Sequence, residues 1–270
     1  GWKEGKAGTN CDPCNGWYGI KCTNSRVSSI ELSSNNLDGV LTSLDKLDSN
    51  LVVFKCDSNQ LSGNLPSLSK NINLNVFTCE TNFQISGEIP DLANCPKLEI
   101  FICGSNRLTG RMPNLNLLKN LKEFDCSWNR IQDSIPNLSN NLALQKFIGR
   151  GNLLVGVLPD LSQNTMLSHF AFNNNSLEGK IPDISSNSKL EEFNCSYNNL
   201  SGCYPVGVCN ETIVFSFQNN PKLPWQGDYN RFCNGEAQIG ARCDDLVSHT
   251  LNDKILSNCE CGGSQIIPCD

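Results

Sequence analysis

Hydrophobic and polar residues follow one arrangement that returns along most of this chain at an almost constant interval. In residues 98–113, LEIFICGSNRLTGRMP, apolar residues at alternate positions precede an asparagine, and a glycine and a proline follow it. Alternation over so few residues predicts one short strand in each unit, followed by a return segment. A unit of this size cannot bury its own apolar face, so the units are expected to stack into a solenoid. The register asparagines lie 22 to 24 residues apart, at Asn35, Asn59, Asn82, Asn106, Asn129, Asn152, Asn175, Asn198 and, degenerately, Asn220.

The inward strand positions hold a large ring followed two residues later by a small residue. The thiols in the second position should pack as small hydrophobes and stay free, because side chains stacked in register point the same way. Two neighbouring repeats depart from the pattern: the first has Phe147 and Gly149 at its inward positions, and the second has Phe170 and Phe172. We expect the excess side-chain volume of the second layer to compensate the missing volume of the first. The rings are Phe54, Phe77, Phe101, Phe124, Phe147, Phe170, Phe193 and Phe215, and the thiols are Cys56, Cys79, Cys103, Cys126 and Cys195.

The pattern L-x-x-L-x-L-x-x-N-x-L, followed by G-x-[L/I/M]-P as in Gly110 to Pro113, resembles the plant-type subclass of leucine-rich repeats from Val27 to about Leu223. The resemblance implies a leucine-rich repeat solenoid of the α/β class, mostly β with irregular returns. We expect a curved parallel sheet of about nine strands whose ends are stapled by disulfides. The expected domains are an N-terminal cysteine-rich cap (1–26), the solenoid of eight full repeats and a degenerate ninth (27–223), and a cysteine-rich C-terminal module (224–270).

Cysteine usage indicates an oxidising compartment. Of the 16 cysteines, the five inward thiols and Cys95 in a return segment should be buried and free. The other ten lie at the two ends and in one loop, and an even, end-loaded count favours a secreted protein with disulfide caps. They are Cys11, Cys14, Cys22, Cys203, Cys209, Cys233, Cys243, Cys259, Cys261 and Cys269.

The segment CDPCNGWYGIKC resembles the N-terminal cap of plant-type arrays, which implies a Cys14–Cys22 bridge with Trp17 packed over the first repeat. The partner of Cys11 stays open, and a metal site at Cys11 and Cys14 lacks the second ligand pair that zinc requires. Cys203 and Cys209 flank a six-residue step that would close a small loop.

The tail from Cys243 to Gly263 resembles a cysteine-rich module of large secreted bacterial and algal surface proteins, although Leu246 replaces the usual glycine. Its carboxylates, Asp244, Asp245 and Asp253, are of the type that calcium prefers, but they lack EF-hand spacing. Solvated turn carboxylates are the more common alternative, and no metal or cofactor is expected.

Charge and composition exclude several functions. A net charge of -6 and a pI near 5.0 argue against nucleic acid or an acidic membrane surface as partner. No apolar run approaches the ~18 residues of a transmembrane segment. The sequence begins at Gly1 without a signal peptide, so a leader has either been removed or lies outside it. His169 and His249 are the only histidines, and neither accompanies a catalytic triad pattern, so we expect no enzyme.

The outward strand face is the expected binding surface, because rigid sheet positions present side chains at regular intervals. The alternative is that β-branched residues there merely favour strands and that the aromatic residues are ordinary surface residues. The candidate residues are an apolar strip, Val53, Val76, Ile100, Ile102 and Ile148, with Trp128 as anchor and Tyr197 further along. Candidate N-glycosylation sequons lie at Asn137, Asn174, Asn194, Asn199 and Asn210.

These observations predict a secreted, non-enzymatic protein that acts through its surfaces. The first hypothesis is extracellular recognition or assembly, meaning adhesion to a protein or glycan, or self-association into a larger structure. The resemblance implies an alternative, a receptor ectodomain or inhibitor-like protein that binds a protein or peptide ligand. A third hypothesis, an enzyme that uses the C-terminal module, has no catalytic motif to support it.

Overall fold

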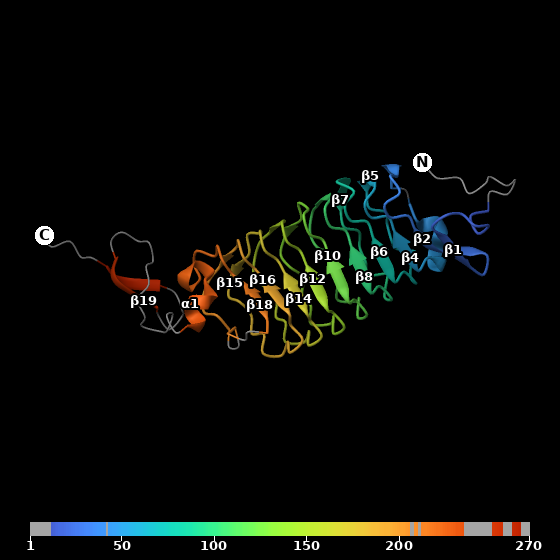
Figure 1. Cartoon of the computed structure of the whole chain (residues 1–270). Helices are drawn as coiled ribbons and strands as arrows, with labels where there is room; N and C mark the ends of the chain where they lie inside the picture. Colours follow the sequence, from blue (N-terminus) through green and yellow to red (C-terminus); the bar gives the residue numbers. More distant parts are fainter. Residues whose placement is uncertain are drawn as a thin grey trace.

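The computed structural model describes residues 12–41, 43–205, 208–209 and 212–234, together with the backbone of two strands at 250–255 and 261–265. The repeats coil into an elongated stack in which each turn lies beside the next along the sequence (Figure 1). This is the predicted leucine-rich repeat solenoid.

The main sheet takes one strand from each turn. It has ten strands in sequence order, of which the first is antiparallel to the second and the rest are parallel. Phenylalanine lies opposite phenylalanine from one strand to the next, as the register of Phe101 with Phe77 and Phe124 shows. The strands are β1 (Ile20–Thr23), β2 (Arg26–Glu31), β4 (Val53–Lys55), β6 (Val76–Thr78), β8 (Ile100–Ile102), β10 (Glu123–Asp125), β12 (Lys146–Ile148), β14 (His169–Ala171), β16 (Glu192–Asn194) and β18 (Val214–Ser216).

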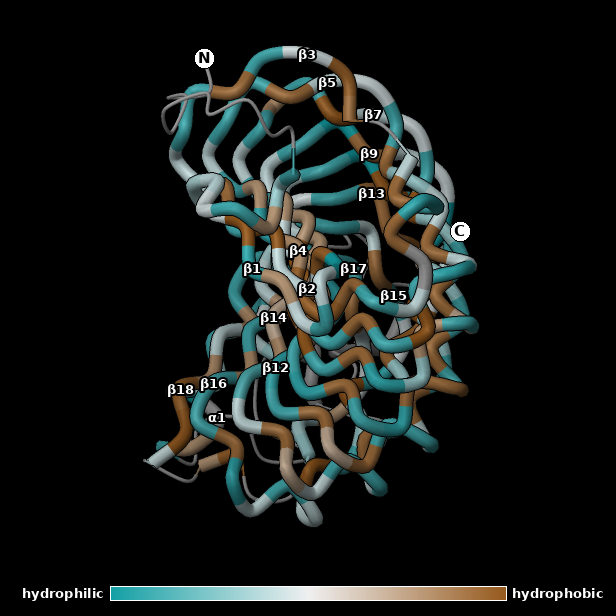
Figure 2. Tube along the Cα trace, turned by 90° about the vertical axis from the view of Figure 1, so that its right-hand side faces the viewer, coloured by the Kyte–Doolittle hydropathy of each residue, from teal (hydrophilic) through white to brown (hydrophobic). Residues whose placement is uncertain are grey.

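A second row of strands, which the sequence did not predict, follows the register asparagines on the other side of the coil (Figure 2). The glycines of this row have a positive φ, and Gly63, Gly87 and Gly179 lie close to the preceding repeat. A Cβ at Gly63 would approach Val40 Cγ1 to 2.7 Å, so glycine permits both the bend and the stacking. The strands are β3 (Asp38–Val40), β5 (Gln60–Asn64), β7 (Gln84–Glu88), β9 (Arg107–Thr109), β11 (Gln132–Asp133), β13 (Leu153–Leu154), β15 (Glu178–Gly179) and β17 (Asn199–Leu200).

The return segments contain little helix, as expected. The first return forms the 3-10 helix η1 (Asp45–Asn50), and later returns make single turns such as those closed by Leu138, Asn141 and Leu144. Beyond the last repeat lie η2 (Pro224–Gly227), α1 (Tyr229–Cys233) and the antiparallel pair β19 (Thr250–Ile255) and β20 (Cys261–Gln265). No helix in the described part of the chain is long and apolar enough to span a membrane.

A spine of aromatic rings fills the core. The phenylalanine rings of successive strands lie 5.0 to 6.4 Å apart, and six of them have no exposed surface. The predicted compensation is confirmed, since Phe172 lies 5.0 Å from Phe147 and its ring fills the space over Gly149. The predicted burial of six free thiols is also confirmed, including that of Cys95.

Buried asparagines connect the repeats through backbone hydrogen bonds. Asn106 Nδ2 donates to the carbonyls of Cys79 and Cys103 at 3.1 Å, and Asn129 Oδ1 accepts the amide hydrogen of Leu108 at 2.9 Å. Because amide and carbonyl partners come from neighbouring turns, each side chain fixes two repeats at once.

A second asparagine ladder, which the sequence analysis missed, runs through the returns. Asn141, Asn164 and Asn187 are almost fully buried, and Asn164 Nδ2 donates to the carbonyls of Leu138 and Asn141 at 3.1 and 3.0 Å. Cys95 occupies the equivalent position in the return that lies three repeats before that of Asn164. The sequence contains a signal for this ladder. An asparagine recurs every 23 residues at Asn141, Asn164 and Asn187, and each lies three residues before the last leucine of its return.

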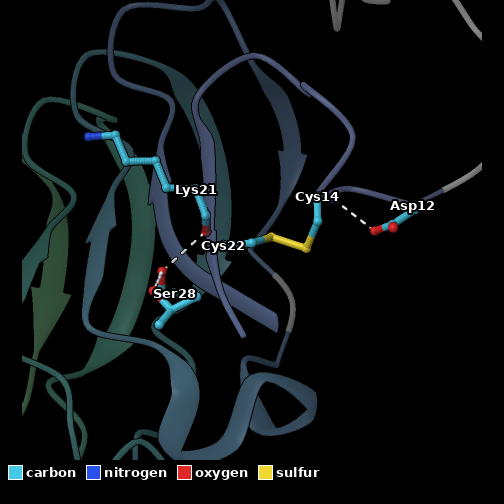
Figure 3. The surroundings of a disulfide bond; sticks show 6 residues. Asp12, Cys14, Lys21, Cys22 and Ser28 are labelled. Carbon is cyan, nitrogen blue, oxygen red and sulfur yellow. Dashed lines mark hydrogen bonds between the residues drawn. A yellow bond between two sulfur atoms is a disulfide. The ribbon is translucent and has the colours of Figure 1, made fainter. Parts of the chain in front are cut away.

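Disulfides close both ends of the array. The bridge Cys14–Cys22 is confirmed, and Asp12 Oδ1 accepts the amide hydrogen of Cys14 beside it (Figure 3). The expected small loop between Cys203 and Cys209 is wrong, because Cys209 pairs with Cys233. Helix α1 brings Cys233 there by placing Tyr229 edge-on against Phe215 and Phe217 of the last repeat.

Cys203 is disulfide-bonded as well. The side chains of Cys11, Cys243, Cys259, Cys261 and Cys269, and the aspartates considered for calcium, lie outside the described residues.

Candidate binding surface on the strand face

The outward positions of the main sheet form one continuous surface, here called the strand face. It consists of the residues directly before and after each inward phenylalanine, or directly before and after Ile30 in β2, together with the third and fourth residues after that inward residue. The parallel register continues beyond the strands, since Ser58 N donates to Glu80 O and Trp128 N donates to Arg150 O. Equivalent residues of successive repeats therefore stand in columns.

Four residues of the predicted apolar strip lie together on the strand face. Val53, Val76 and Ile100 are register partners on β4, β6 and β8, and Ile102 follows two residues after Ile100. All four are half-buried, so they offer apolar surface to a ligand. This arrangement is the contiguous patch that the sequence predicted.

Ile148 does not belong to that exposed patch. It faces outward on β12 but is only 8% exposed, and its register partner Ala171 is fully buried. Side chains from adjacent strands lie close together on a sheet, so neighbours can cover an outward residue of moderate size. The prediction that Ile148 is an exposed contact is therefore wrong.

Trp128 lies at the edge of the strand face in a left-handed backbone conformation. It is 54% exposed and has a φ of 54°, and Tyr197 is 56% exposed with a φ of 55°. Bulky residues rarely adopt this conformation, and such strain persists only where surrounding structure enforces it. The whole column shares the conformation: Ser34, Ser58, Thr81, Ser105, Trp128, Gly151, Asn174, Tyr197 and Asn219.

Gly151 in the next repeat provides the surface on which the Trp128 ring rests. A Cβ at Gly151 would lie 2.4 Å from Trp128 Cε3 and 2.7 Å from Cζ3, so the ring covers the glycine backbone. Any side chain at Gly151 would displace the indole. The sequence pattern indicates Trp128 as a contact but not Gly151, whose signal is a glycine where equivalent positions hold serine, threonine, asparagine or an aromatic residue.

Three carboxylates on this face, those of Asp57, Glu80 and Asp125, have no ion pair among the described residues. Asp57 accepts hydrogen bonds from Thr78 Oγ1 at 2.6 Å and Ser33 Oγ at 2.9 Å. Partial burial, followed by the negative charges of Asp57, Asp125 and Glu123, raises the pKa of Glu80 above its usual value. A negative charge at Glu80 is thus disfavoured by its own surroundings.

One cluster superficially resembles a hydrolytic triad. Ser168 Oγ lies 2.9 Å from His169 Nδ1, and His169 Nε2 lies 3.9 Å from Glu191. However, Ser168 Oγ is also in donor geometry to the carbonyl of Gln145 at 3.0 Å, which directs its hydrogen away from the imidazole. The Glu191 side chain is 72% exposed, so the arrangement lacks the shielded carboxylate that orients a histidine base in a triad.

The predicted sequons are placed differently with respect to this surface. Asn137 is exposed on a return, and Asn174 is exposed in the column of Trp128. Asn194 on β16 and Asn199 on β17 are half-buried, and Asn210 is not among the described residues. Tyr197, the second predicted aromatic contact, lies three repeats from Trp128 and does not join the apolar strip.

Comparison with known proteins gives likenesses of structure. No family model matches the chain, and no curated protein matches its sequence. The solved structures that resemble it include the following three. The ectodomain of the receptor kinase GASSHO1/SCHENGEN3 from Arabidopsis thaliana has a TM-score of 0.60 and 23% identity over 78% of this chain and 32% of that one. A TDR receptor has a TM-score of 0.58 and 27% identity over 71% and 38%. The Arabidopsis HAESA ectodomain has a TM-score of 0.52 and 22% identity over 78% and 50%.

This chain spans a third to a half of the length of those proteins. At such identities the likeness is one of fold, and it agrees with the repeat register, the phenylalanine spine and the asparagine ladder described above. The chain is therefore a leucine-rich repeat solenoid, similar in fold to the ectodomains of plant membrane receptors.

Proposed function

We propose that this protein is an extracellular recognition module that binds a protein or peptide ligand on its strand face. The disulfide-closed ends suit an oxidising, extracellular environment. Solved structures of the same fold include GASSHO1/SCHENGEN3 in complex with CASPARIAN STRIP INTEGRITY FACTOR 2 and HAESA in complex with a peptide hormone. That likeness concerns the fold, so the proposal depends on the surface itself.

The observation that carries the proposal is the fixed position of Trp128 beside a half-buried apolar strip. Its backbone conformation is unfavourable for a large residue, and its ring lies over Gly151 while half of it faces solvent. A side chain held in this way loses little conformational entropy when a ligand covers it. Exposed, pre-positioned tryptophans are typical anchors of protein interfaces.

This is the receptor-like or inhibitor-like hypothesis, and it displaces adhesion or self-association as the leading one. A closed or fibrous assembly needs a surface that complements either itself or another part of the chain. The strand face presents one anchored tryptophan and one short strip, a size that suits an extended peptide segment.

The test uses substitutions that the chain itself makes at equivalent positions. Trp128→Ser places serine where Ser105 occupies the same left-handed position one repeat earlier, and Ile102→Thr copies Thr78 on the adjacent strand. Leu153→Ser removes an exposed leucine from β13, in the second row of strands, as a matched control. A phage-displayed library of random 12-residue peptides supplies the ligands.

We expect enriched peptides to bind the wild type and Leu153→Ser equally and to bind the Trp128→Ser/Ile102→Thr variant at least tenfold more weakly. Equal binding to all three proteins, or no enrichment, would overturn the proposal. Sedimentation velocity on the same proteins distinguishes ligand binding by a monomer from self-association. A wild-type monomer agrees with the proposal, whereas oligomers that the double variant abolishes would establish self-association through this face instead.

A further inference from the structure

Charge is distributed unequally along the strand face. The outward columns of the first five repeats contain one lysine, Lys55, against five carboxylates, whereas those of the last four contain Lys146, Arg150 and one carboxylate, Glu192. The apolar strip and Trp128 lie in or next to the acidic part. The five carboxylates belong to Glu31, Asp57, Glu80, Glu123 and Asp125.

Only two of these five carboxylates are paired within the described residues. Lys21 Nζ lies 2.8 Å from Glu31, and Lys146 Nζ lies 3.7 Å from Glu123. The unpaired three, Asp57, Glu80 and Asp125, are next to the strip, and Lys55 forms no ion pair with any of them in the part of the chain that the structure describes. Their charge is therefore free to attract a cation.

Neutral donors orient two of these carboxylates without cancelling their charge. Asp57 accepts from Thr78 Oγ1, Ser33 Oγ and the amide of Glu80, the last at 3.0 Å. Asp125 Oδ1 accepts the amide hydrogen of Ser127 at 2.8 Å. Fixed acceptors of this kind suit a ligand that must be held in one position, because they need no reorganisation on binding.

Gly104 lies between these groups. It stands in the same outward column as Asp57, Glu80 and Ser127, but it contributes no side chain. A Cβ built on Gly104 would lie 3.6 Å from Asp125 Oδ1 and 3.3 Å from Ser127 O. The backbone of Gly104 is buried, so it forms the floor beneath the flanking side chains.

An independent observation at the same place is the hydroxyl of Ser127. This side chain is 5% exposed, and its oxygen has no hydrogen-bond partner among the described residues. Ser127 follows Asp125 by two residues along an extended chain, so both side chains face outward, next to Gly104. A buried hydroxyl without a partner costs about 1 to 3 kcal/mol, which a donor from a ligand would offset.

We infer that the ligand of the strand face carries an arginine or lysine side chain, which lies over Gly104 between Glu80 and Asp125 while neighbouring ligand residues cover the apolar strip. This inference rests on the proposed function and adds the chemistry of the ligand to it. Long side chains of this kind combine an apolar stem, suited to Ile102, with a terminal cation. Burial and, after it, the nearby negative charges raise the pKa of Glu80, and a ligand cation would offset the repulsion among these charges.

The probe is a synthetic ten-residue peptide in which valine and arginine alternate, compared with a peptide in which glutamine replaces every arginine. Calorimetry measures Kd at low and at moderate salt. We expect the glutamine peptide to bind at least tenfold more weakly, and the affinity of the arginine peptide to fall as salt increases. Equal affinity of the two peptides would overturn the inference.

Four variants locate the cation. Glu80→Gln and Asp125→Asn each remove one charge, and Asn194 already occupies the position of Asp125 on β16 and accepts from Ser196 N in the same way. Gly104→Ser adds a side chain at this position without changing charge and copies Ser127, the next residue in the column. Glu178→Gln on β15 removes an exposed charge outside the strand face and is the control.

We expect roughly three- to tenfold losses of arginine-peptide affinity for the first three variants and none for Glu178→Gln, with unchanged thermal unfolding in all four. An equal loss of arginine-peptide affinity for Glu178→Gln would show that the peptide responds only to the net charge of the protein. This result would overturn the inference. If library peptides require Trp128 but contain no basic residue, the inference fails while the proposed function stands. If no peptide requires Trp128, the proposed function itself fails.

Discussion

At the scale of single residues, conformation and neighbourhood decide what a side chain can do. Trp128 and Ser105 occupy the same left-handed position in adjacent repeats, yet only Trp128 has a glycine beside it in the next repeat. The pair of Trp128 and Gly151 therefore acts as one unit. A sequence search for aromatic residues finds only half of that unit.

The buried thiols show the same dependence on surroundings. Burial raises the pKa of Cys79, Cys103 and Cys126 well above the usual thiol range, and it raises the pKa of Cys95 to about 11. Thiolates, which are the reactive form, are therefore scarce at neutral pH. The four residues are structural hydrophobes rather than nucleophiles or redox centres.

This predicts the outcome of alkylation. Iodoacetamide added to the folded protein at pH 8 should leave all six described free cysteines unmodified, whereas protein in denaturant should be labelled at each of them. Mass mapping of the peptides gives the result. Rapid labelling of Cys103 in the native protein would contradict the burial of this column.

At the scale of elements, the unit of stability is the contact between adjacent repeats. The layer of Phe147 and Gly149 is complete only because Phe172 of the following repeat enters it. A small inward residue in one turn can thus be offset by a large one in the next turn, provided that the summed side-chain volume is conserved. In the regular repeats, one ring and one thiol fill the core layer without a contribution from the next turn.

A double-mutant cycle tests this exchange. Gly149→Cys alone would crowd Phe172, whose Cε1 lies 2.5 Å from the Cβ position, and should cost about 1 to 3 kcal/mol. Phe172→Cys alone would leave a cavity and should cost about 3 to 5 kcal/mol. The double variant restores the regular pattern, and we expect it to be more stable than the sum of the two changes indicates.

Urea unfolding of the three variants and the wild type measures the coupling free energy. A substitution of Phe193, which precedes Cys195 by two residues in the regular pattern, offers a control when combined with Gly149→Cys, since the two do not share a layer. Strict additivity of Gly149→Cys and Phe172→Cys would show that the two layers do not compensate each other.

At the scale of the whole molecule, the solenoid has two ends and a core that extends along its length. Contacts run mainly between nearest neighbours, so unfolding can begin at either end without involving the middle. Cys14–Cys22 encloses the turns before β1 and the first residues of β1, and Cys209–Cys233 encloses β18 and α1. Each bridge should protect its own end.

We predict that removing one bridge frays one end only. In the Cys14→Ser/Cys22→Ser variant, amides of β1 and β2 should lose hydrogen-exchange protection, whereas in the Cys209→Ser/Cys233→Ser variant those of β18 should do so. Each change should cost about 2 to 4 kcal/mol locally, while β10 and β12 keep their protection. A uniform loss along the array would mean that the solenoid unfolds as one cooperative unit.

The sequence by itself determined the features that lie within one repeat, namely its inward residues and the position of its turn. The spacing of Phe124, Cys126 and Asn129 shows which residues face inward and where the chain turns, because alternation and turn chemistry are local properties. Repetition of that spacing then requires stacking, which predicts the solenoid and its phenylalanine spine. The resemblance of the N-terminal segment added the Cys14–Cys22 bridge.

Only the tertiary structure decided what happens between repeats. The second row of strands, the burial of Ile148 and the ring of Trp128 lying over Gly151 all depend on how closely one turn approaches the next. The pairing of Cys209 with Cys233 depends on α1 returning to the last repeat. The acidic surroundings of Gly104 arise in the same way, because Glu80, Gly104 and Asp125 come from three different repeats that are about 23 residues apart in sequence and in contact only after stacking.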